Sequence, residues 1–239
     1  ADKKVFPTEA GAYIYSKSSR SKLMEGSIRM AEPVLGTSYN AGGRTELNID
    51  PDEVAKFSAL ADEWWDSEGS YKPLHRINPA RLGYIRDRLV RHFDRDVSGR
   101  RPLDRLTMLD IGCGGGLVCE PLSRLGGQMT GIDASERNIG TARSHAARMG
   151  LAIEYQHMTA EFLVEREAKF DVVMSPQVIE HVPDTNQFLK TCADLVNPGG
   201  ALILSTLNRT PKSFLFGIVG AEYILGWVPR GTHQWKRFV

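Results

Sequence analysis

Between residues 48 and 206, short apolar runs alternate with longer segments in which apolar residues recur at helical spacing. Strands are predicted at 106–111, 128–132, 152–156, 170–174 and 201–206, and the run at 170–174 is apolar in the way that strands buried on both faces of a sheet are. Helical patterns separate them at 117–125, 135–149 and 184–196. The alternation predicts an α/β fold with a doubly wound, mostly parallel sheet and right-handed crossovers.

Two helices are predicted ahead of the first strand, within residues 48–92. Asp50 is a plausible N-cap, and Pro51 follows at the first helical position, where its missing N–H leaves no bond unmade. A loop over 69–79 then leads to a second helix that begins at Ala80.

Residues 1–47 differ from the rest because they are rich in Ser, Gly, Lys and Arg and lack a sustained apolar period. Such a composition predicts an extended or disordered arm that lies in solvent or on a partner. A remnant of an organelle transit peptide is the alternative. The folded domain is therefore predicted over 48–239, with its cofactor-binding core at 106–206.

The composition is that of an ordinary globular domain: 239 residues, 41% hydrophobic, with a formal net charge of +1. Without a basic excess, no nucleic-acid partner is expected. Cys113, Cys119 and Cys192 lack metal-ligand spacing, so they are expected to be packing residues in a reducing compartment. No apolar run reaches the roughly 20 residues of a membrane span.

A tight glycine-rich loop is predicted directly after the run 106–111. Gly112, Gly114 and Gly116 suit sharp backbone turns, and they remove side chains where a ligand could approach. The next strand ends about twenty residues later in Asp133, where a carboxylate can bind both hydroxyls of an adenosine ribose. This order of strand, glycine loop, helix, strand and acid predicts an adenosine-containing cofactor.

The details favour S-adenosylmethionine over NAD. The NAD fingerprint requires a third small residue where this chain has Leu117. Asp110, just before the loop, suits an amino group better than a pyrophosphate, so Asp110 or the loop amides are expected near the methionine moiety. A glycine turn in a domain without a ligand is the alternative.

Further candidates flank this loop. Arg81 opens the predicted second helix, where it could meet the methionine carboxylate, and a surface cation is the alternative. Glu161 follows the strand at 152–156 and could read the adenine edge, or it could be a first-turn helix acid. The paired Trp64 and Trp65 are interpreted as core packing rather than as a substrate clamp.

A polar cluster of Gln177, Glu180 and His181 follows the fourth apolar run. These residues fall within one helical turn, on or near one face. Glu and His together suit either a divalent ion or the abstraction of a proton. Because ligands bind at the carboxyl ends of parallel strands, this cluster is expected at the same edge as the glycine loop, Asp133 and Glu161.

Several motifs resemble the ubiquinone-biosynthesis O-methyltransferases, the enzymes of bacteria and mitochondria that methylate polyprenylated catechols. The similarity covers about residues 49–239, and its last two motifs go beyond a generic methyltransferase signature. The motifs are Trp64-Trp-Asp, the segment from Pro73 to Ile85, Leu109-Asp-Ile-Gly-Cys-Gly-Gly-Gly, Glu180-His-Val-Pro-Asp, Ser205-Thr-Leu-Asn-Arg, the segment from Val219 to Leu225, and Pro229-Arg-Gly-Thr-His.

The resemblance implies a class I methyltransferase fold that binds S-adenosylmethionine near Arg81, Gly112, Asp133 and Pro176. It also implies a divalent ion, magnesium, near Gln177, Glu180 and His181. Two features depart from the family. Gln177 stands where members usually carry Glu. The family fold also normally adds two strands at one sheet edge, and these are expected to be missing from a chain that stops at Val239.

The implied reaction is methylation of a catechol hydroxyl on a polyprenyl catechol or a demethylubiquinol. A metal would stabilise the phenolate, and His181 or Glu180 would take the proton. The expected place is the matrix side of the mitochondrial inner membrane, or a bacterial cytoplasm beside the inner membrane, with other proteins of a membrane-associated complex as partners. The rival interpretation is a methyltransferase-fold accessory subunit of such a complex that has lost catalysis.

The most hydrophobic stretch is 213–230, within a final segment at 207–239. It is too short to span a bilayer, and it contains Glu222. Tyr223, Trp227 and Arg230 suit a membrane interface and predict a peripheral membrane contact. A lid over a polyprenyl tail and a buried core helix are the alternatives.

Overall fold

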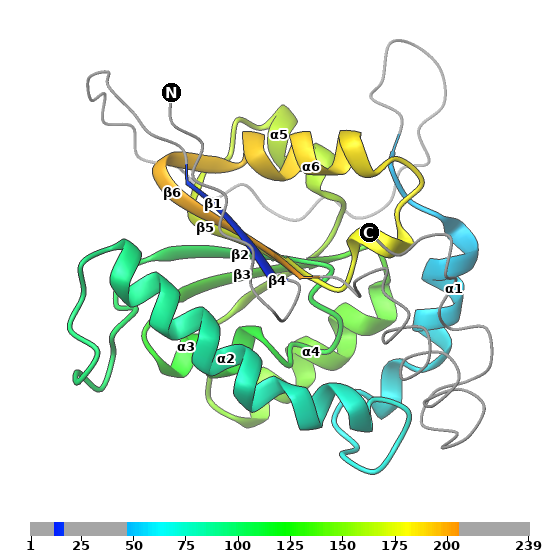
Figure 1. Ribbon diagram of the computed structural model, residues 1–239. Helices are drawn as coiled ribbons and strands as arrows, with labels where there is room; N and C mark the ends of the chain where they lie inside the picture. Colours follow the sequence, from blue (N-terminus) through cyan, green and yellow to red (C-terminus); the bar gives the residue numbers. More distant parts are fainter. Residues whose placement is uncertain (1–11, 17–46, 206–239) are drawn as a thin grey trace, which may run out of the picture.

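Six strands form one sheet in the order β1-β6-β5-β2-β3-β4 (Figure 1). The computed structural model describes residues 47–205 and the backbone of residues 12–16. Strands β2 to β6 are parallel, and β1 is antiparallel to β6, which confirms the predicted doubly wound, mostly parallel sheet. The strands are β1 (Ala12–Ser16), β2 (Thr107–Ile111), β3 (Gln128–Asp133), β4 (Glu154–His157), β5 (Phe170–Pro176) and β6 (Val196–Ser205).

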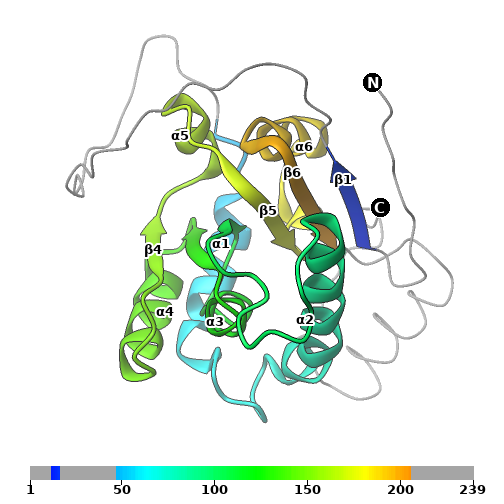
Figure 2. The same ribbon diagram turned by 90° about the vertical axis from the view of Figure 1, so that its left-hand side faces the viewer.

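Helices cover both faces of the sheet (Figures 1 and 2). One face packs on α2, α3 and α4 and the other on α5 and α6, while α1 lies at the edge where the parallel strands end. The helices are α1 (Pro51–Ala59), α2 (Lys72–His92), α3 (Cys119–Arg124), α4 (Glu136–Arg148), α5 (Ala160–Glu165) and α6 (Thr185–Asp194), with single 3₁₀ turns η1 (Ala61–Glu63) and η2 (Ile179–His181).

Two separate apolar cores result from the period-two alternation of the strands. In β2, Met108 belongs to the core under α2, α3 and α4, whereas Leu109 belongs to the core under α5 and α6. Both side chains are fully buried. The strand is therefore apolar on both faces, which is why it appears as a continuous run in the sequence.

The strand order reverses at β2. From β2 the chain moves outward to β3 and β4, and it then returns to place β5 and β6 on the other side. The loops after β2 and β5 therefore flank the switch point, where open α/β sheets bind their ligands.

The second helix begins earlier than the pattern predicts. It starts at Lys72 rather than Ala80 and runs through Pro79, so the predicted loop over 69–79 is mostly helical. Pro73 lies in the first turn, where no N–H is needed, and Pro79 removes one bond from the ladder. Burial of Ile85 and Leu89 holds the remaining turns against the sheet.

A strand in residues 12–16 is not predicted by the composition of the N-terminal arm. It pairs along β6 from Ala12 opposite Ser205 to Ser16 opposite Ala201, so a segment of the arm covers the β6 edge. Strand β6 itself begins at Val196, where the pattern predicts the end of a helix, and its pairing with β5 is irregular near Phe170. Residues 207–239, including 213–230, lie outside the described residues.

Candidate cofactor and acceptor site

The glycine loop turns as predicted, but protein side chains fill the space beside it. Gly112, Gly114 and Gly116 have φ values of 72°, 53° and 90°, in the region that favours glycine. A Cβ on these residues would overlap, respectively, the side chains of Val178, Trp64 and Tyr155. The glycines are thus required by close packing of protein side chains. The prediction that they leave room for a ligand is not met at these three positions.

Asp133 closes over this loop from the end of β3. Its Oδ2 accepts the Gly114 N–H at 2.9 Å, and its Oδ1 accepts the Ser135 N–H at 2.8 Å and the Asn138 Nδ2 at 3.2 Å. Burial raises the pKa of the Asp133 carboxyl, and these three bonds oppose that rise. The carboxylate is fixed in direction at the predicted ribose position.

Two residues that hold Asp133 in place were not predicted. Asn138 accepts the Trp64 Nε1–H at 2.9 Å on its amide oxygen while its nitrogen faces Asp133. The only sequence signal was a polar residue on the inward face of α4, where Ile139 and Ala142 are also buried. Trp64 therefore does more than pack: it connects η1 to the carboxylate.

Asp110 is 1% exposed under the glycine loop. Burial raises the pKa of its carboxyl to about 7, and the Cys119 thiol, which donates to Oδ2 at 3.3 Å, and Arg81 both lower it. Its Oδ1 has no hydrogen-bond partner within residues 47–205. A buried acceptor of this kind is costly unless a ligand donates to it, which fits the amino group of a methionine moiety.

Glu161 lies in the first turn of α5 and is buried. It is close enough to Cys192 of α6 to raise the pKa of that thiol, after the larger effect of burial. Glu161 therefore has the position of a first-turn helix acid that packs toward α6. This was the alternative to a role in reading the adenine edge. The neighbouring Thr159 hydroxyl is buried with no partner in the described part of the chain, so it is the better polar group for the adenine end.

Arg81 and Gln177 meet directly, and they connect the two halves of the site. The Arg81 guanidinium donates to the Gln177 Oε1 at 2.5 Å. Burial lowers the Arg81 pKa, and the nearby charges of Asp110 and Glu180 oppose this. Arg81 lies inside α2 rather than at its start, but its position between Asp110 and the β5 loop agrees with a role at the site.

The loop after β5 is held in an unusual conformation. Gln177 follows Pro176 with a φ of 59°, and its N–H donates to the Ser205 carbonyl at 2.7 Å. Positive φ in a non-glycine residue costs free energy, and such residues gather at functional sites. The turn places Val178 against Gly112, so the glycine loop after β2 and the loop after β5 are in contact.

His181 is oriented by the first helix. Its Nδ1 lies 2.7 Å from the Glu53 Oε2, and its ring meets Phe57 edge-on at a centroid distance of 5.0 Å. This role of Glu53 was not predicted from the sequence, because its partner is 128 positions away. Glu180 and His181 thus share the turn η2, whereas Gln177 precedes it with a positive φ, so the predicted single helical turn does not include Gln177. Residues of α1 contact His181.

Comparisons with known proteins agree with this geometry. A family model described as a methyltransferase domain matches residues 109–204. The fold resembles magnesium protoporphyrin IX methyltransferase from Synechocystis PCC 6803 with bound SAM (TM-score 0.51, 20% identity, 62% of this chain and 71% of that one). It also resembles the DhpI-SAM-HEP complex (TM-score 0.51, 21% identity, 73% and 72%). The fold is that of a class I S-adenosylmethionine-dependent methyltransferase.

Closer relatives define the family. The ubiquinone biosynthesis O-methyltransferase of Parvibaculum lavamentivorans is 55% identical over 192 residues, covering 80% of this chain and 76% of the relative. The protein of the same name from Caulobacter vibrioides is 55% identical over 200 residues, covering 83% and 79%. This chain belongs to the ubiquinone biosynthesis O-methyltransferase family.

Proposed function

We propose that this chain is an S-adenosylmethionine-dependent O-methyltransferase of ubiquinone biosynthesis that methylates a catechol hydroxyl of a polyprenylated precursor. The observation that carries the proposal is the contact between the two loops at the switch point. There Asp133 is fixed over the glycine loop, while His181 and Glu53 lie on the acceptor side. Relatives that are more than half identical over three quarters of their length are named ubiquinone biosynthesis O-methyltransferases.

The chain's own residues match the cofactor end to end. Asp133 is oriented toward a ribose, Asp110 offers a buried acceptor for an ammonium group, and the Thr159 hydroxyl is placed for an adenine edge. Arg81 supplies a buried cation for a carboxylate. When bound, the cofactor supplies an electrophilic methyl group on a sulfonium.

The acceptor side must remove a phenolic proton, since a phenol ionises near pH ~10. A neutral His181 that donates its Nδ1–H to Glu53 carries its lone pair on Nε2, where it can take that proton. The phenolate oxygen then forms its bond to the methyl carbon as the carbon–sulfur bond breaks. The products are a methyl ether and S-adenosylhomocysteine.

The magnesium ion that the family resemblance implies does not fit the described side chains. No group of three or more His, Cys, Asp or Glu residues within residues 47–205 is placed to hold a metal ion. The Gln177 oxygen accepts from Arg81, and a guanidinium at that oxygen repels a dication. A neutral amide is also a weaker ligand than a carboxylate. No step above is therefore routed through a metal.

A peripheral membrane contact through 213–230 remains part of the proposal, and so does a place on the matrix side of the mitochondrial inner membrane within a protein complex. The support is the apolar and interfacial composition of that segment, which lies outside the described residues. None of the described helices is both long and apolar enough to cross a membrane. The accessory-subunit alternative has no observation in its favour.

The direct test is methyl transfer to a catechol with a short prenyl tail by the full chain and S-adenosylmethionine, with the methyl ether detected by mass spectrometry. We expect turnover in the wild-type protein and turnover slower by roughly 10²–10⁴ in His181→Ala, with cofactor binding retained in both. A folded wild-type chain that binds the cofactor yet gives no product would transfer support to the accessory subunit.

A further inference from the structure

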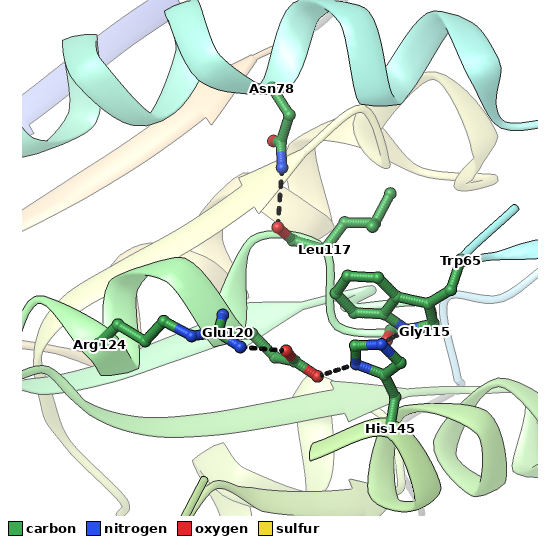
Figure 3. Close-up of polar contacts among 7 residues, drawn as sticks. All are labelled: Trp65, Asn78, Gly115, Leu117, Glu120, Arg124 and His145. Carbon is green, nitrogen blue, oxygen red and sulfur yellow. Dashed lines mark hydrogen bonds and ion pairs between the residues drawn. The ribbon is translucent and has the colours of Figure 1, made fainter. Parts of the chain in front are cut away.

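Side chains supply the hydrogen bonds that two carbonyl groups of the glycine loop lack. In a helix each carbonyl accepts from the N–H four residues on. The Leu117 carbonyl would need that donor from residue 121, which is Pro121 and has no N–H. The Asn78 Nδ2 of α2 donates to Leu117 instead, at 2.8 Å (Figure 3).

The Gly115 carbonyl is satisfied in the same way. Helix α3 begins only at Cys119, and the Trp65 Nε1–H donates to the Gly115 oxygen at 2.9 Å. Both donors come from the segment before the sheet, 50 and 39 positions away from the carbonyls that they hold. Because a peptide is planar, fixing these two carbonyls also fixes the N–H groups of Gly116 and Val118.

Trp65 is itself held by a buried polar pair. Its indole stacks on the His145 ring at a centroid distance of 3.5 Å, with 6° between the planes (Figure 3). The His145 Nδ1 lies 2.6 Å from the Glu120 Oε1, and Arg124 donates to the other oxygen at 3.2 Å. The Glu120 side chain is 0% exposed.

A buried polar pair of this kind is weak evidence for stability, because an apolar pair of the same volume often stabilises as much. Its geometric result is specific, however: Glu120 sets the His145 ring, and the ring sets the plane of Trp65 beside the glycine loop. We propose that four positioning residues, which we call the loop brace, set the affinity of the glycine loop for S-adenosylmethionine. The loop brace consists of Trp65, Asn78, His145 and Glu120. This proposal rests on the proposed function.

The brace predicts a change in binding without a change in chemistry. Trp65→Phe keeps a ring on His145 but removes the donor to Gly115, so the loop spends less time in its binding conformation. The apparent dissociation constant equals the intrinsic one divided by the fraction of molecules in the binding conformation, so it rises as that fraction falls. We expect S-adenosylmethionine to bind about 5- to 30-fold more weakly, as one unpaired carbonyl implies. Turnover at saturating cofactor should stay within about twofold of wild type, because the bound complex restores the loop.

Thr107→Val is the matched control. Thr107 exchanges two hydrogen bonds with Asp171 at the amino end of β2, away from the loop. Its loss should lower the melting temperature and leave cofactor affinity unchanged. Calorimetry with S-adenosylmethionine on full-length wild type, Trp65→Phe and Thr107→Val shows whether Trp65 positions the glycine loop or only stabilises the fold. Wild-type affinity in folded Trp65→Phe overturns the brace.

His145→Gln provides a second route if Trp65→Phe does not fold. Glutamine can still donate to Glu120 but offers no ring, so affinity should again fall, and wild-type affinity here would equally overturn the proposal. Should the wild-type chain bind no cofactor, the proposed function fails separately. Hydrogen exchange at residues 112–118 of the unliganded protein still tests the brace: exchange must be faster in the brace variant and unchanged in Thr107→Val.

Discussion

The Trp64 indole donates to the Asn138 Oδ1 at 2.9 Å, which fixes the orientation of the Asn138 amide. An indole N–H can only donate, so the amide oxygen must face Trp64 and the NH₂ group must face Asp133. The aromatic residue thereby sets a donor against the carboxylate predicted to bind the ribose. Cofactor binding is tied through this contact to the helices that precede the sheet.

Removing the carboxylate should weaken cofactor binding. Asp133→Ala loses charge-assisted hydrogen bonds to the ribose, for an expected cost of about 1.5–3 kcal/mol in binding free energy. Isothermal titration calorimetry with S-adenosylmethionine measures it. Asp62→Ala removes an exposed carboxylate that pairs with Arg137 on α4, and it serves as the control. Unchanged affinity in Asp133→Ala would remove Asp133 from the site.

Asp110 should make stability depend on pH. Its pKa in the folded protein is raised from 3.8 to about 7, so between these values the folded form keeps a proton that the unfolded chain has lost. Stability therefore falls as pH rises from about 4 to about 7, by at most about 4 kcal/mol for three pKa units, and is flat above.

Asp110→Asn tests this dependence. Urea unfolding at pH 5 and pH 8 should show a smaller difference between the two pH values in the variant than in the wild type, because the amide does not titrate. Taking the difference between the two proteins removes the contribution of all other groups. Equal pH dependence in both would mean that Asp110 stays ionised in the folded protein.

The pair of Glu53 and His181 should matter for turnover rather than for cofactor affinity. His181→Ala removes the proposed base and is expected to lower kcat by roughly 10²–10⁴. Glu53→Gln leaves the ring in place with a weaker partner, so kcat should fall less. His92→Ala replaces a half-buried histidine that is bonded to the Gly199 carbonyl, and it is the control in the same initial-rate assay. Wild-type kcat in both site variants contradicts the base.

The residue at position 177 should decide how tightly a divalent cation binds near Glu180 and His181. Gln177→Glu adds a carboxylate beside Glu180, and a more negative site binds magnesium more tightly. Because the ion does not fit the described side chains of the wild type, we expect magnesium to raise the thermal stability of the variant and to leave that of the wild type unchanged. The measurement is a magnesium titration of each protein after treatment with a chelator. Identical, metal-independent turnover in both proteins argues against any metal at this position.

The predicted membrane contact can be measured on the full chain. Replacing Phe214, Phe216 and Trp227 by Ser removes apolar and interfacial groups from 213–230 and should reduce co-sedimentation with liposomes. Circular dichroism must show that the variant still folds. Unchanged sedimentation would favour the core-helix alternative for this segment.

The sequence predicted features that depend on local chemistry. Asp50 caps its helix as expected, because the cap is decided within four residues. The order of the parallel strands and the position of Asp133 follow from the alternation of elements.

Contacts between distant segments were not predictable in this way. The roles of Glu53 and Asn138 depend on partners 128 and 74 positions away, and no local pattern signals such pairs. The start of α2 was also missed, since Pro79 has the pattern of a helix breaker and only burial against the sheet overrides it.

Pro121 has a consequence for which part of the chain is needed to bind the cofactor. It replaces a bond to a near neighbour in the chain with one from Asn78, and so the glycine loop cannot reach its final form from the alternating strands and helices alone. A fragment that begins at β2 would keep the parallel strands but leave the Leu117 carbonyl without its donor. The unit that binds the cofactor therefore extends back into α2, beyond the residues that the methyltransferase-domain model matches.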